Sequence, residues 1–411
     1  MLHRSSAVAS PVRALHRPVR PLAPLLAFVV LYAMIYAAFG VASPYWPLFF
    51  ESRGIGAEQL GIIFGLATVM RLVAGPVFGR VADMVSAPRA VLAICAALAA
   101  CLASGLLLVN GFWLLALVEM GHGAALAPVT TLADALALGA AKPRSPHGFE
   151  YGWVRGSASA AFIVGTLASG QLLHLLQLPS VVWMHSALLI GAVFASAYVP
   201  GLRARPPAQS SGMRSALAGV RELYSITAYR WLIVIAALVY GSHAMHDTFS
   251  VIRWNAAGIN SSTVSLLWSE SVAAEVVVFF LHGPALVNRI GPSGAATLAA
   301  CAGIIRWSAM ALTTAPAMLA LLQPLHGLTF ALLHLACMRL IAIVAPAYLA
   351  ATAQALYAFG IGLVTALLMF VSGALYEHLG ANAFLLMAAL CALALPLTVR
   401  LRVHVSPYQV S

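Results

Sequence analysis

The sequence predicts an all-α membrane protein that crosses the lipid bilayer many times. Of its 411 residues, 62% are hydrophobic and 8% are charged, whereas soluble proteins carry roughly a quarter charged residues. The apolar runs are too continuous for the alternating strands of a membrane barrel, and an open sheet cannot cross lipid with its edges unpaired. We therefore expect an α-helical bundle of twelve transmembrane helices in two six-helix halves.

The twelve apolar runs are separated by the proline, glycine and charged residues that interrupt them. Each is close to the roughly 20 residues that an α-helix needs to cross the hydrocarbon core. In chain order the expected spans cover residues 24–47, 58–82, 90–109, 112–138, 152–176, 181–200, 229–252, 263–287, 293–313, 316–343, 347–376 and 383–400. The five cysteines fall inside these runs without CxxC spacing, so we expect no disulfide framework, no zinc site and no cofactor.

Basic residues gather at alternate ends of the spans, which fixes the expected orientation. The loops predicted to lie outside hold only Arg53 and Arg253. The other basic loop residues fall on the predicted cytoplasmic side: Arg4, Arg13, Arg17, Arg20, Arg80, Arg89, Lys142, Arg144, Arg203, Arg205, Arg214, Arg221, Arg230, Arg289, Arg400 and Arg402. We therefore expect a bacterial cytoplasmic (inner) membrane protein with both termini in the cytoplasm. The net charge of +11 is spread over many span ends, so no nucleic-acid partner is expected.

A long polar stretch from Gly201 to Thr227 divides the predicted spans six and six. The expected domains are a cytoplasmic tail at 1–23, a first half at 24–200, a cytoplasmic linker at 201–228, a second half at 229–402 and a tail at 403–411. The end of the second span, "AGPVFGRVADMVSAPR", is similar to the end of the eighth, "LHGPALVNRIGPSG". Each has Gly-Pro followed by a polar residue at the cytoplasmic turn, Asp83 or Asn288, which favours a parallel internal repeat.

Charged side chains within the spans are costly and usually face a cavity or a partner. His243, His246 and Asp247 share one helix face, because they are spaced i, i+3 and i+4. Carboxyl and imidazole groups in such places can change protonation near neutral pH. Two groups lie at matching depths: Asp134 with Arg155, which predicts an ion pair, and His243, His246, Asp247, Glu275, Arg306 and His326. The remaining ionisable residues in the spans include Arg71, Glu119, His122, Glu270 and His334.

These residues carry a family resemblance. Twelve spans, a central loop and Gly79-x-x-x-Asp83 after the second span resemble the major facilitator superfamily, although Met84 and Ser86 depart from the usual loop motif. Further segments resemble the phenylpropionate permease family, a relative of the lactose and nucleoside proton symporters. They include "SPYWPLFFESRGIGAEQLGIIFG" (43–65), "TLADAL" (131–136), "YGWVRGSASAAFIVG" (151–165), "SHAMHDTF" (242–249), "LLWSESVAAEVVVF" (266–279) and "QPLHGLTFALLH" (323–334). The resemblance covers nearly the whole chain and does not fix the substrate.

The resemblance implies a secondary active transporter that moves a small organic solute, such as an aromatic or carboxylic acid, by proton-coupled alternating access. Arg supplies two aligned donors for a carboxylate, and Trp46, Trp268 and other aromatic residues are candidate cavity walls. His246 and Asp247 replace aromatic residues of the family pattern, so we expect substrate choice to differ there. The assigned roles are proton coupling for Glu275, Arg306, His326 and His334; substrate binding for His243, His246, Asp247, Arg71, Glu119, His122, Trp254 and Tyr357; and conformational or ion-pair roles for Asp134, Arg155, Asp83 and Asn288.

Two alternatives remain open. His243, His246 and Asp247 have the chemistry of metal ligands, so a divalent transition-metal transporter is the second hypothesis, although no resident metal is assigned. An enzyme or a receptor is the third, but neither a Ser-His-Asp arrangement, a P-loop nor a dinucleotide fingerprint appears. The expected partners are a small-molecule solute, the proton and the lipid bilayer, and the chain is expected to be a monomer.

Overall fold

The computed structural model describes residues 22–141, 149–173, 175–201 and 213–401, and no strand occurs among them. The predicted tails and residues 202–212 of the predicted linker lie outside this description. So do the side chains of most of the predicted cytoplasmic arginines before span 7. The helices of the first half are α1 (Leu22–Ala42), α2 (Trp46–Ser52), α3 (Ala57–Met84), α4 (Pro88–Gly105), α5 (Phe112–Ala140), α6 (Tyr151–Leu172) and α7 (Ser180–Ser196).

The second half begins after α8 (Met213–Ser225). Two of its segments are π-helical, η1 and η2, and the others are α-helical or short 3₁₀ turns. In chain order they are α9 (Thr227–Gly241), α10 (His243–Ala256), α11 (Ser261–Val277), η1 (Val278–His282), α12 (Gly283–Leu312), α13 (Pro316–Leu322), η2 (Gly327–Leu332), α14 (Leu333–Val344), η3 (Ala347–Leu349), α15 (Ala350–Leu379), η4 (Gly380–Asn382), α16 (Ala383–Leu397) and η5 (Thr398–Leu401).

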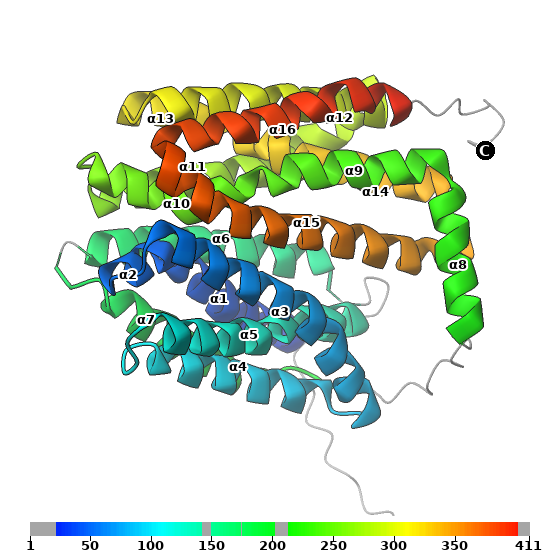
Figure 1. Ribbon diagram of the computed structural model, residues 1–411. Helices are drawn as coiled ribbons and strands as arrows, with labels where there is room; N and C mark the ends of the chain where they lie inside the picture. The colour runs from blue at the N-terminus through cyan, green and yellow to red at the C-terminus, as the bar shows by residue number, and fades with distance from the viewer. Residues whose placement is uncertain (1–21, 142–148, 174, 202–212, 402–411) are drawn as a thin grey trace, which may run out of the picture.

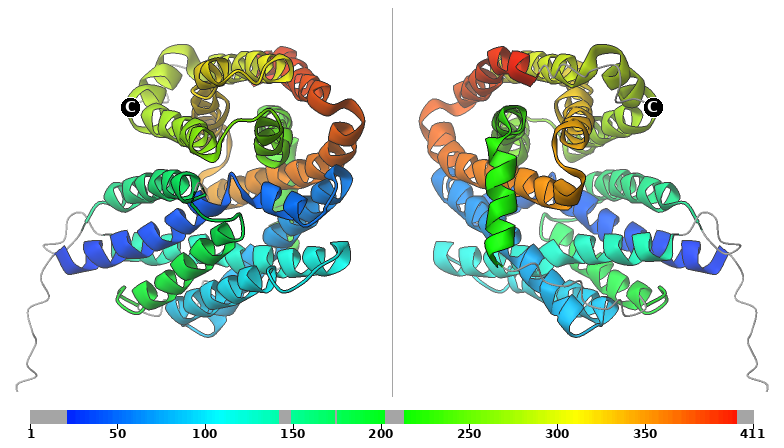
Figure 2. Two further views of the ribbon diagram at one scale, coloured as in Figure 1. Left: turned by 90° about the vertical axis from the view of Figure 1, so that its left-hand side faces the viewer. Right: turned by 90° about the vertical axis from the view of Figure 1, so that its right-hand side faces the viewer.

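The helices form two bundles that lie side by side with nearly parallel axes. In Figure 1 the helices α1 to α7 form the lower bundle and α9 to α16 the upper one. Figure 2 shows the same two layers from either end. Helix α8 runs across one end of the molecule, almost at right angles to the others. The sequence placed this segment in a linker without predicting a helix, and the domain limits themselves stay a prediction.

The bundle presents an apolar surface long enough to span a bilayer. Eight stretches of the described residues are apolar and long enough to cross a membrane. Two of them, Ser261–Leu312 and Ala347–Leu401, exceed 50 residues and are interrupted by glycines with positive φ, Gly291 at 71° and Gly380 at 54°. A helix of this length is about twice what one crossing needs. The α-helical membrane fold is thus confirmed, and the count of twelve spans stays a prediction.

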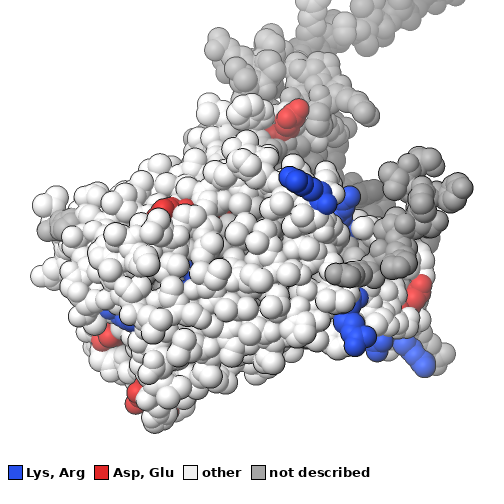
Figure 3. All heavy atoms as spheres, turned by 90° about the horizontal axis from the view of Figure 1, so that it is seen from above, with Lys and Arg blue, Asp and Glu red and all other residues white. Residues whose placement is uncertain are grey.

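Charged side chains are sparse over the visible face in Figure 3, and those of Lys and Arg lie mostly toward one end. This is the end that carries α8, and Arg221 and Arg230 lie on or next to that helix. The opposite end carries Arg53, which donates to the backbone carbonyl of Val109 at 2.7 Å. An uneven distribution of arginines between the two ends is the pattern on which the predicted orientation rests.

The two halves are sealed together at the end opposite α8. Helix α3 packs against α15 and α6 packs against α11. At the first crossing Gly61 lies so close that a Cβ there would be 2.9 Å from Cα of Gly373. At the second, Ser261 donates to the Gly170 carbonyl at 2.9 Å. Tyr45 also donates to the carbonyl of Ser261, at 2.7 Å. Among the described residues, the hydrogen bonds between the halves lie at this end, together with one from Thr68, nearer the middle of α3, to Met369.

Candidate functional site

A cavity of about 470 Å³ lies between the two halves. Its size is within the range of small-molecule sites, which are mostly apolar with a few polar groups that fix orientation. Both halves contribute to its wall, because the cavity lies between them. The first half provides Phe39, Ala42, Ser43, Trp46, Pro47, Phe64, Arg71, Glu119, His122, Leu126, Phe162 and His185. The second provides Tyr240, His243, His246, Asp247, Thr248, Trp268, Ser271, Val272, Glu275, His326, Phe330, Ile361, Thr365 and Met369.

Arg306 is the centre of the polar network in the second half. It lies on α12 and is fully buried. Its guanidinium donates to Nδ1 of His326 at 2.8 Å. Because that nitrogen accepts, a neutral His326 carries its hydrogen on Nε2, which lies 2.7 Å from the Glu275 carboxylate. The three side chains therefore form one directed chain from the cation to a carboxylate that lines the cavity.

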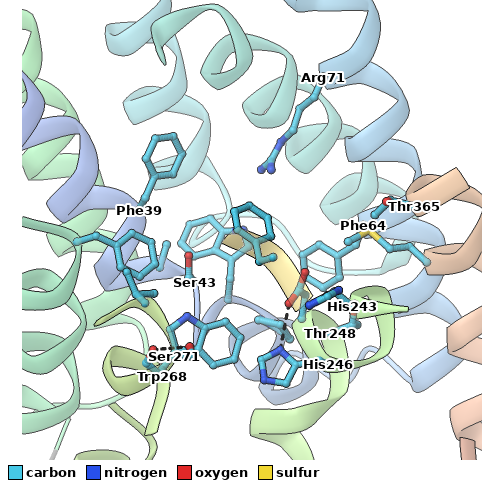
Figure 4. Close-up of a pocket in the computed structure, with 18 of the residues that line it drawn as sticks. Phe39, Ser43, Phe64, Arg71, His243, His246, Thr248, Trp268, Ser271 and Thr365 are labelled. Carbon is cyan, nitrogen blue, oxygen red and sulfur yellow. Dashed lines mark hydrogen bonds and ion pairs between the residues drawn. The ribbon is translucent and has the colours of Figure 1, made fainter. Parts of the chain in front are cut away.

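A second branch leaves the same guanidinium. Arg306 approaches Nε2 of His246 at 3.3 Å, and the Nδ1 of His246 is 3.1 Å from Asp247. Gln323 accepts a further hydrogen bond from the guanidinium, at 3.0 Å. The side chain of Asp247 is 47% exposed, and that exposure is to the cavity, whose wall it forms. In Figure 4 the dashed line from His246 marks this contact.

The charges of this network do not balance when both acids are ionised. One guanidinium stands against two carboxylates, Glu275 and Asp247, which leaves one negative charge in excess. Charged groups in a low-dielectric interior are stable only when they are paired. One proton on either carboxylate would restore neutrality, so the network has a place for one exchangeable proton.

Helix α10 positions the two histidines, and Ser242, which separates α9 from α10, keeps helical dihedral angles, with φ −61° and ψ −17°. His243 lies at the first position of α10, where its Nδ1 donates to the carbonyl of Val239 at 3.0 Å. Its Nε2 is 3.0 Å from the Thr329 hydroxyl. One helical turn later, His246 stacks on Trp268 with ring centroids 4.9 Å apart. The predicted shared face of His243, His246 and Asp247 is present, since all three line the cavity.

The first half contributes a different polar group. Glu119 and His122 lie on α5, one turn apart, and His185 lies on α7. The Glu119 carboxylate is 3.2 Å from Nδ1 of His122 and accepts from the Trp46 indole at 3.1 Å. The other nitrogen of His122 is 3.1 Å from Nε2 of His185. We call Glu119, His122 and His185 the first-half triad.

Arg71 points from α3 into the cavity, as Figure 4 shows. Its side chain is exposed to this space and makes no hydrogen bond or ion pair with any other described residue. His246 and Trp268 face it from the other side of the cavity. Trp46, Phe64 and other aromatic residues belong to the wall of the same cavity. A free guanidinium beside aromatic surface suits a ligand that has a carboxylate and an apolar body.

Three predicted site residues lie away from this cavity. His334 packs against Phe279, with ring centroids 5.8 Å apart, and is not part of the Arg306 network. Trp254 is fully buried and reaches only the far edge of His246, at 6.2 Å between ring centroids. Tyr357 is also buried and does not line the cavity. Trp254 and Tyr357 are buried in the core and do not line the cavity in this structure, and their predicted substrate contacts stay a prediction.

Asp134 and Arg155, which were predicted to form an ion pair, are not in direct contact in this structure. Asp134 instead accepts from the hydroxyls of Tyr32, at 2.5 Å, and Tyr151, at 2.7 Å. Arg155 donates to the hydroxyl of Tyr36. The tyrosines occupy the space between the two charges. The predicted turn residues lie apart as well: Asn288 accepts from Arg339 of its own half, and Asp83 is an exposed residue near the end of α3.

The arrangement of the span-7 cluster does not favour the metal hypothesis. Both ring nitrogens of His243 are engaged, one of them with the backbone of its own helix. Both nitrogens of His246 are engaged with Arg306 and Asp247. A metal ligand needs a free lone pair, and the adjacent guanidinium would repel a cation. Among the described residues, no group of three or more His, Cys, Asp or Glu is arranged to hold a metal ion.

Two polar members of the hydrogen-bonded networks, His185 and Gln323, were not predicted. His185 lies alone in the sixth predicted span, and its partner His122 is 63 residues away, so no local pattern indicates the contact. Gln323 begins the quoted segment "QPLHGLTFALLH" but carries no charge, so a search limited to ionisable side chains within the spans does not find it. A search for every polar side chain within the spans, including histidine and glutamine, would have found both.

The known proteins that this chain resembles are named as transporters or permeases. The model of the MFS_1 like family matches residues 25–387. A probable 3-phenylpropionic acid transporter of Escherichia coli (strain K12) is 29% identical over 365 residues, which cover 87% of this chain and 92% of that protein. A maltose permease of Geobacillus stearothermophilus is 24% identical, over 89% of this chain and 91% of that protein. The crystal structure of the nucleoside transporter NupG has a TM-score of 0.79 at 16% identity and covers 92% of this chain and 99% of that chain.

Proposed function

The chain belongs to the MFS_1 like family, and from this premise we propose that it is a proton-coupled symporter for a small aromatic or aliphatic carboxylic acid. That it is a transporter and not an enzyme follows from the family and its relatives. The proposal adds the driving ion and the class of solute. It also places the chain as a monomer in a bacterial inner membrane, with both termini in the cytoplasm.

One observation carries the proposal: the same cavity holds an unpaired guanidinium and a carboxylate that is linked to a buried cation. Arg71 provides the first and Glu275, through His326, the second. A carboxylate solute would take the free guanidinium and lay its apolar body against the aromatic wall. The relative from E. coli is named for a substrate of this chemistry, an acid with a phenyl ring. That name supports the solute class without fixing the compound.

Coupling follows from the charge count of the Arg306 network. A proton on Glu275 removes one of two negative charges, so Arg306 and Asp247 remain as a balanced pair. Loss of that proton restores the excess negative charge, which Glu275 shares with the Nε2–H of His326 at 2.7 Å. A buried excess charge is costly, so the protonated and deprotonated forms favour different arrangements of the two halves. Such a difference in stability is what biases a carrier between inward- and outward-open states.

The test is uptake into proteoliposomes with an imposed pH gradient. The probes are 3-phenylpropionate, a short aliphatic carboxylate, maltose and a nucleoside. We expect accumulation of the carboxylates when the outside is acidic. In Glu275→Gln, accumulation driven by the gradient should be lost, while exchange of labelled for unlabelled solute is retained, because exchange needs no net proton movement.

Glu270→Gln is the matched control. Glu270 lies on the same helix, half-buried and outside the cavity wall, so this variant should accumulate solute like the unmodified protein. Undiminished accumulation in Glu275→Gln would contradict the assigned proton site. Uptake of maltose or the nucleoside in preference to both acids would contradict the solute class.

A further inference from the structure

The first-half triad is chemically separate from the Arg306 network. Glu119 is fully buried, and His122 and His185 are 2% and 1% exposed. The three side chains come from α5 and α7, whereas the network belongs to the other half. Nothing in the proposed coupling through Glu275 uses them. A carboxyl group and two imidazoles in continuous contact are nevertheless a group that can hold a proton.

Hydrogen-bond accounting gives the three contacts of the triad one hydrogen more than two neutral imidazoles and an ionised carboxylate carry. The backbone carbonyl of Ala38, 2.8 Å from Nδ1 of His185, can only accept, so this nitrogen carries a hydrogen. The contact between His122 and His185 needs a second hydrogen, at 3.1 Å. The contact between His122 and Glu119 needs a third, at 3.2 Å. Two neutral imidazoles and one carboxylate bring only two hydrogens to these three contacts.

The third hydrogen is therefore an added proton. It resides on an imidazole, which makes an imidazolium beside a carboxylate, or on Glu119, which makes all three groups neutral. In every case the triad has no net charge. Without this proton a lone pair of His122 would face the carboxylate across 3.2 Å in a buried place. Such a pair is costly, so the contact depends on the proton.

The triad borders the cavity. Oε1 of Glu119 is buried and has no hydrogen-bond partner among the described residues, and Glu119, His122 and His185 all line the cavity. Arg71, from α3, is the one other charged group of the cavity wall that the described part of the first half provides. The helix α4, which packs on α5 and α7, has a single charged residue, Arg89, and it donates to Val199.

We propose that Glu119, His122 and His185 form a second proton-binding site, which holds one proton and exchanges it with the cavity. The site takes up a proton from water in the cavity and holds it at the contact between His122 and Glu119. The expected role of Glu119 and His122 thereby changes from contact with the solute to storage of a proton beside Arg71. Use of this proton in symport rests on the proposed function, but its binding does not.

The test counts protons in the solute-free protein. The full chain in detergent is taken from mildly acidic to mildly alkaline pH, and the protons released per chain are measured with a pH indicator. In Glu119→Gln the side-chain amide can donate to Nδ1 of His122 permanently, so no proton is needed for that contact. We expect this variant to release one proton fewer per chain than the unmodified protein.

Glu150→Gln is the control, because Glu150 is an exposed carboxylate just before α6; its proton release should equal that of the unmodified protein. Equal release by Glu119→Gln and the unmodified protein would overturn the proposal. If Glu119→Gln fails to fold, infrared difference spectra of the unmodified protein with ring-labelled histidine decide the question. A carboxylic acid or imidazolium band that vanishes at alkaline pH and is absent in His122→Asn supports the site. Neutral rings and an ionised carboxylate throughout the range refute it. Because no solute is present, this result is independent of whether the symport proposal holds.

Discussion

Arg306 is linked to two carboxylates, to Glu275 through His326 and to Asp247 through His246. The link to Asp247 lowers the free-energy cost of protonating Glu275. Breaking a buried ion pair by removing one partner costs about 3–5 kcal/mol, because the other charge is left uncompensated. In a network with Glu275 alone, its protonation would leave Arg306 in that position. Here Asp247, linked through His246, retains a negative charge near the guanidinium. The residues that depart from the family pattern therefore leave Arg306 with a carboxylate nearby whether or not Glu275 is protonated.

Arg71 gives the sharpest test of solute binding at the scale of a residue. Arg71→Gln removes the unpaired guanidinium of the cavity, and loss of one partner of a desolvated charge pair costs about 2 kcal/mol or more. The Kd for 3-phenylpropionate, measured by calorimetry on the detergent-purified protein, should rise by roughly 30-fold. Arg71→Lys keeps the charge but loses the two aligned donors, so its Kd should lie between the two.

Arg80→Gln is the control for this series. Arg80 lies on the same helix, α3, and is exposed outside the cavity wall. Its substitution should leave the Kd unchanged. An Arg71→Gln protein that binds 3-phenylpropionate as tightly as the unmodified one would show that the carboxylate is recognised elsewhere.

Site residues could be predicted where an ionisable side chain stands out in an apolar run. Glu275, Arg306 and His326 were found in this way, and the structure brings them into contact. Which face of a helix a residue occupies could not be predicted, and this is why Trp254 and Tyr357 lie outside the cavity wall where the sequence placed them in it. The contacts of tyrosine hydroxyls with Asp134 and Arg155 could not be predicted for the same reason. Such contacts depend on how each helix is rotated about its own axis within the bundle. A helix that is apolar on every face does not show in its sequence which face points inward.

At the scale of elements, the two π-helical segments follow the two ion-paired residues. The segment η1 begins three residues after Glu275, and η2 begins directly after His326. These segments are in contact with one another. π-Helical turns are rare and occur frequently at functional sites, because they shift the register of the helix that carries them. The sequence predicted the helices but not these segments, since each is a local departure within a continuous apolar run.

The crossing of α3 and α15 should control the closure of the sealed end. A methyl group at Gly61 would lie 2.7 Å from the backbone oxygen of Met369, and backbone cannot move aside as a side chain can. Gly61→Ala should therefore separate the halves at this end and favour the opposite conformation. A cysteine in place of Ser43, which lines the cavity, should then react faster with a thiol reagent added from that side, in a background without the native cysteines.

Gly75→Ala provides the comparison on the same helix, because a Cβ at Gly75 would meet nothing within 4 Å. Its labelling rate should equal that of the parent protein. If Gly61→Ala leaves the rate at Ser43→Cys unchanged as well, the glycine contact does not govern the closure.

At the scale of the whole molecule, the predicted orientation can be tested at the two ends of the second half. Ser225 ends α8 and Ala257 follows α10; both are exposed, and the helices between them run the length of the bundle. The arginine-rich end should face the cytoplasm. A membrane-impermeant maleimide added to intact cells should therefore label Ala257→Cys, and should label Ser225→Cys only after the cells are lysed. The reverse pattern would invert the predicted topology.

The sealed end has a consequence for how the carrier responds to its medium. Its contacts are mostly between neutral groups: a glycine crossing, serine hydroxyls and backbone carbonyls. The carboxylate of Glu377, which accepts from the backbone of Glu58, is the exception. Dissolved salt screens interactions between exposed charges and leaves contacts between neutral groups almost unaffected. Closure at this end should therefore depend on what occupies the cavity and scarcely on ionic strength, so that a cell in brackish or in fresh water would have a carrier with the same resting conformation.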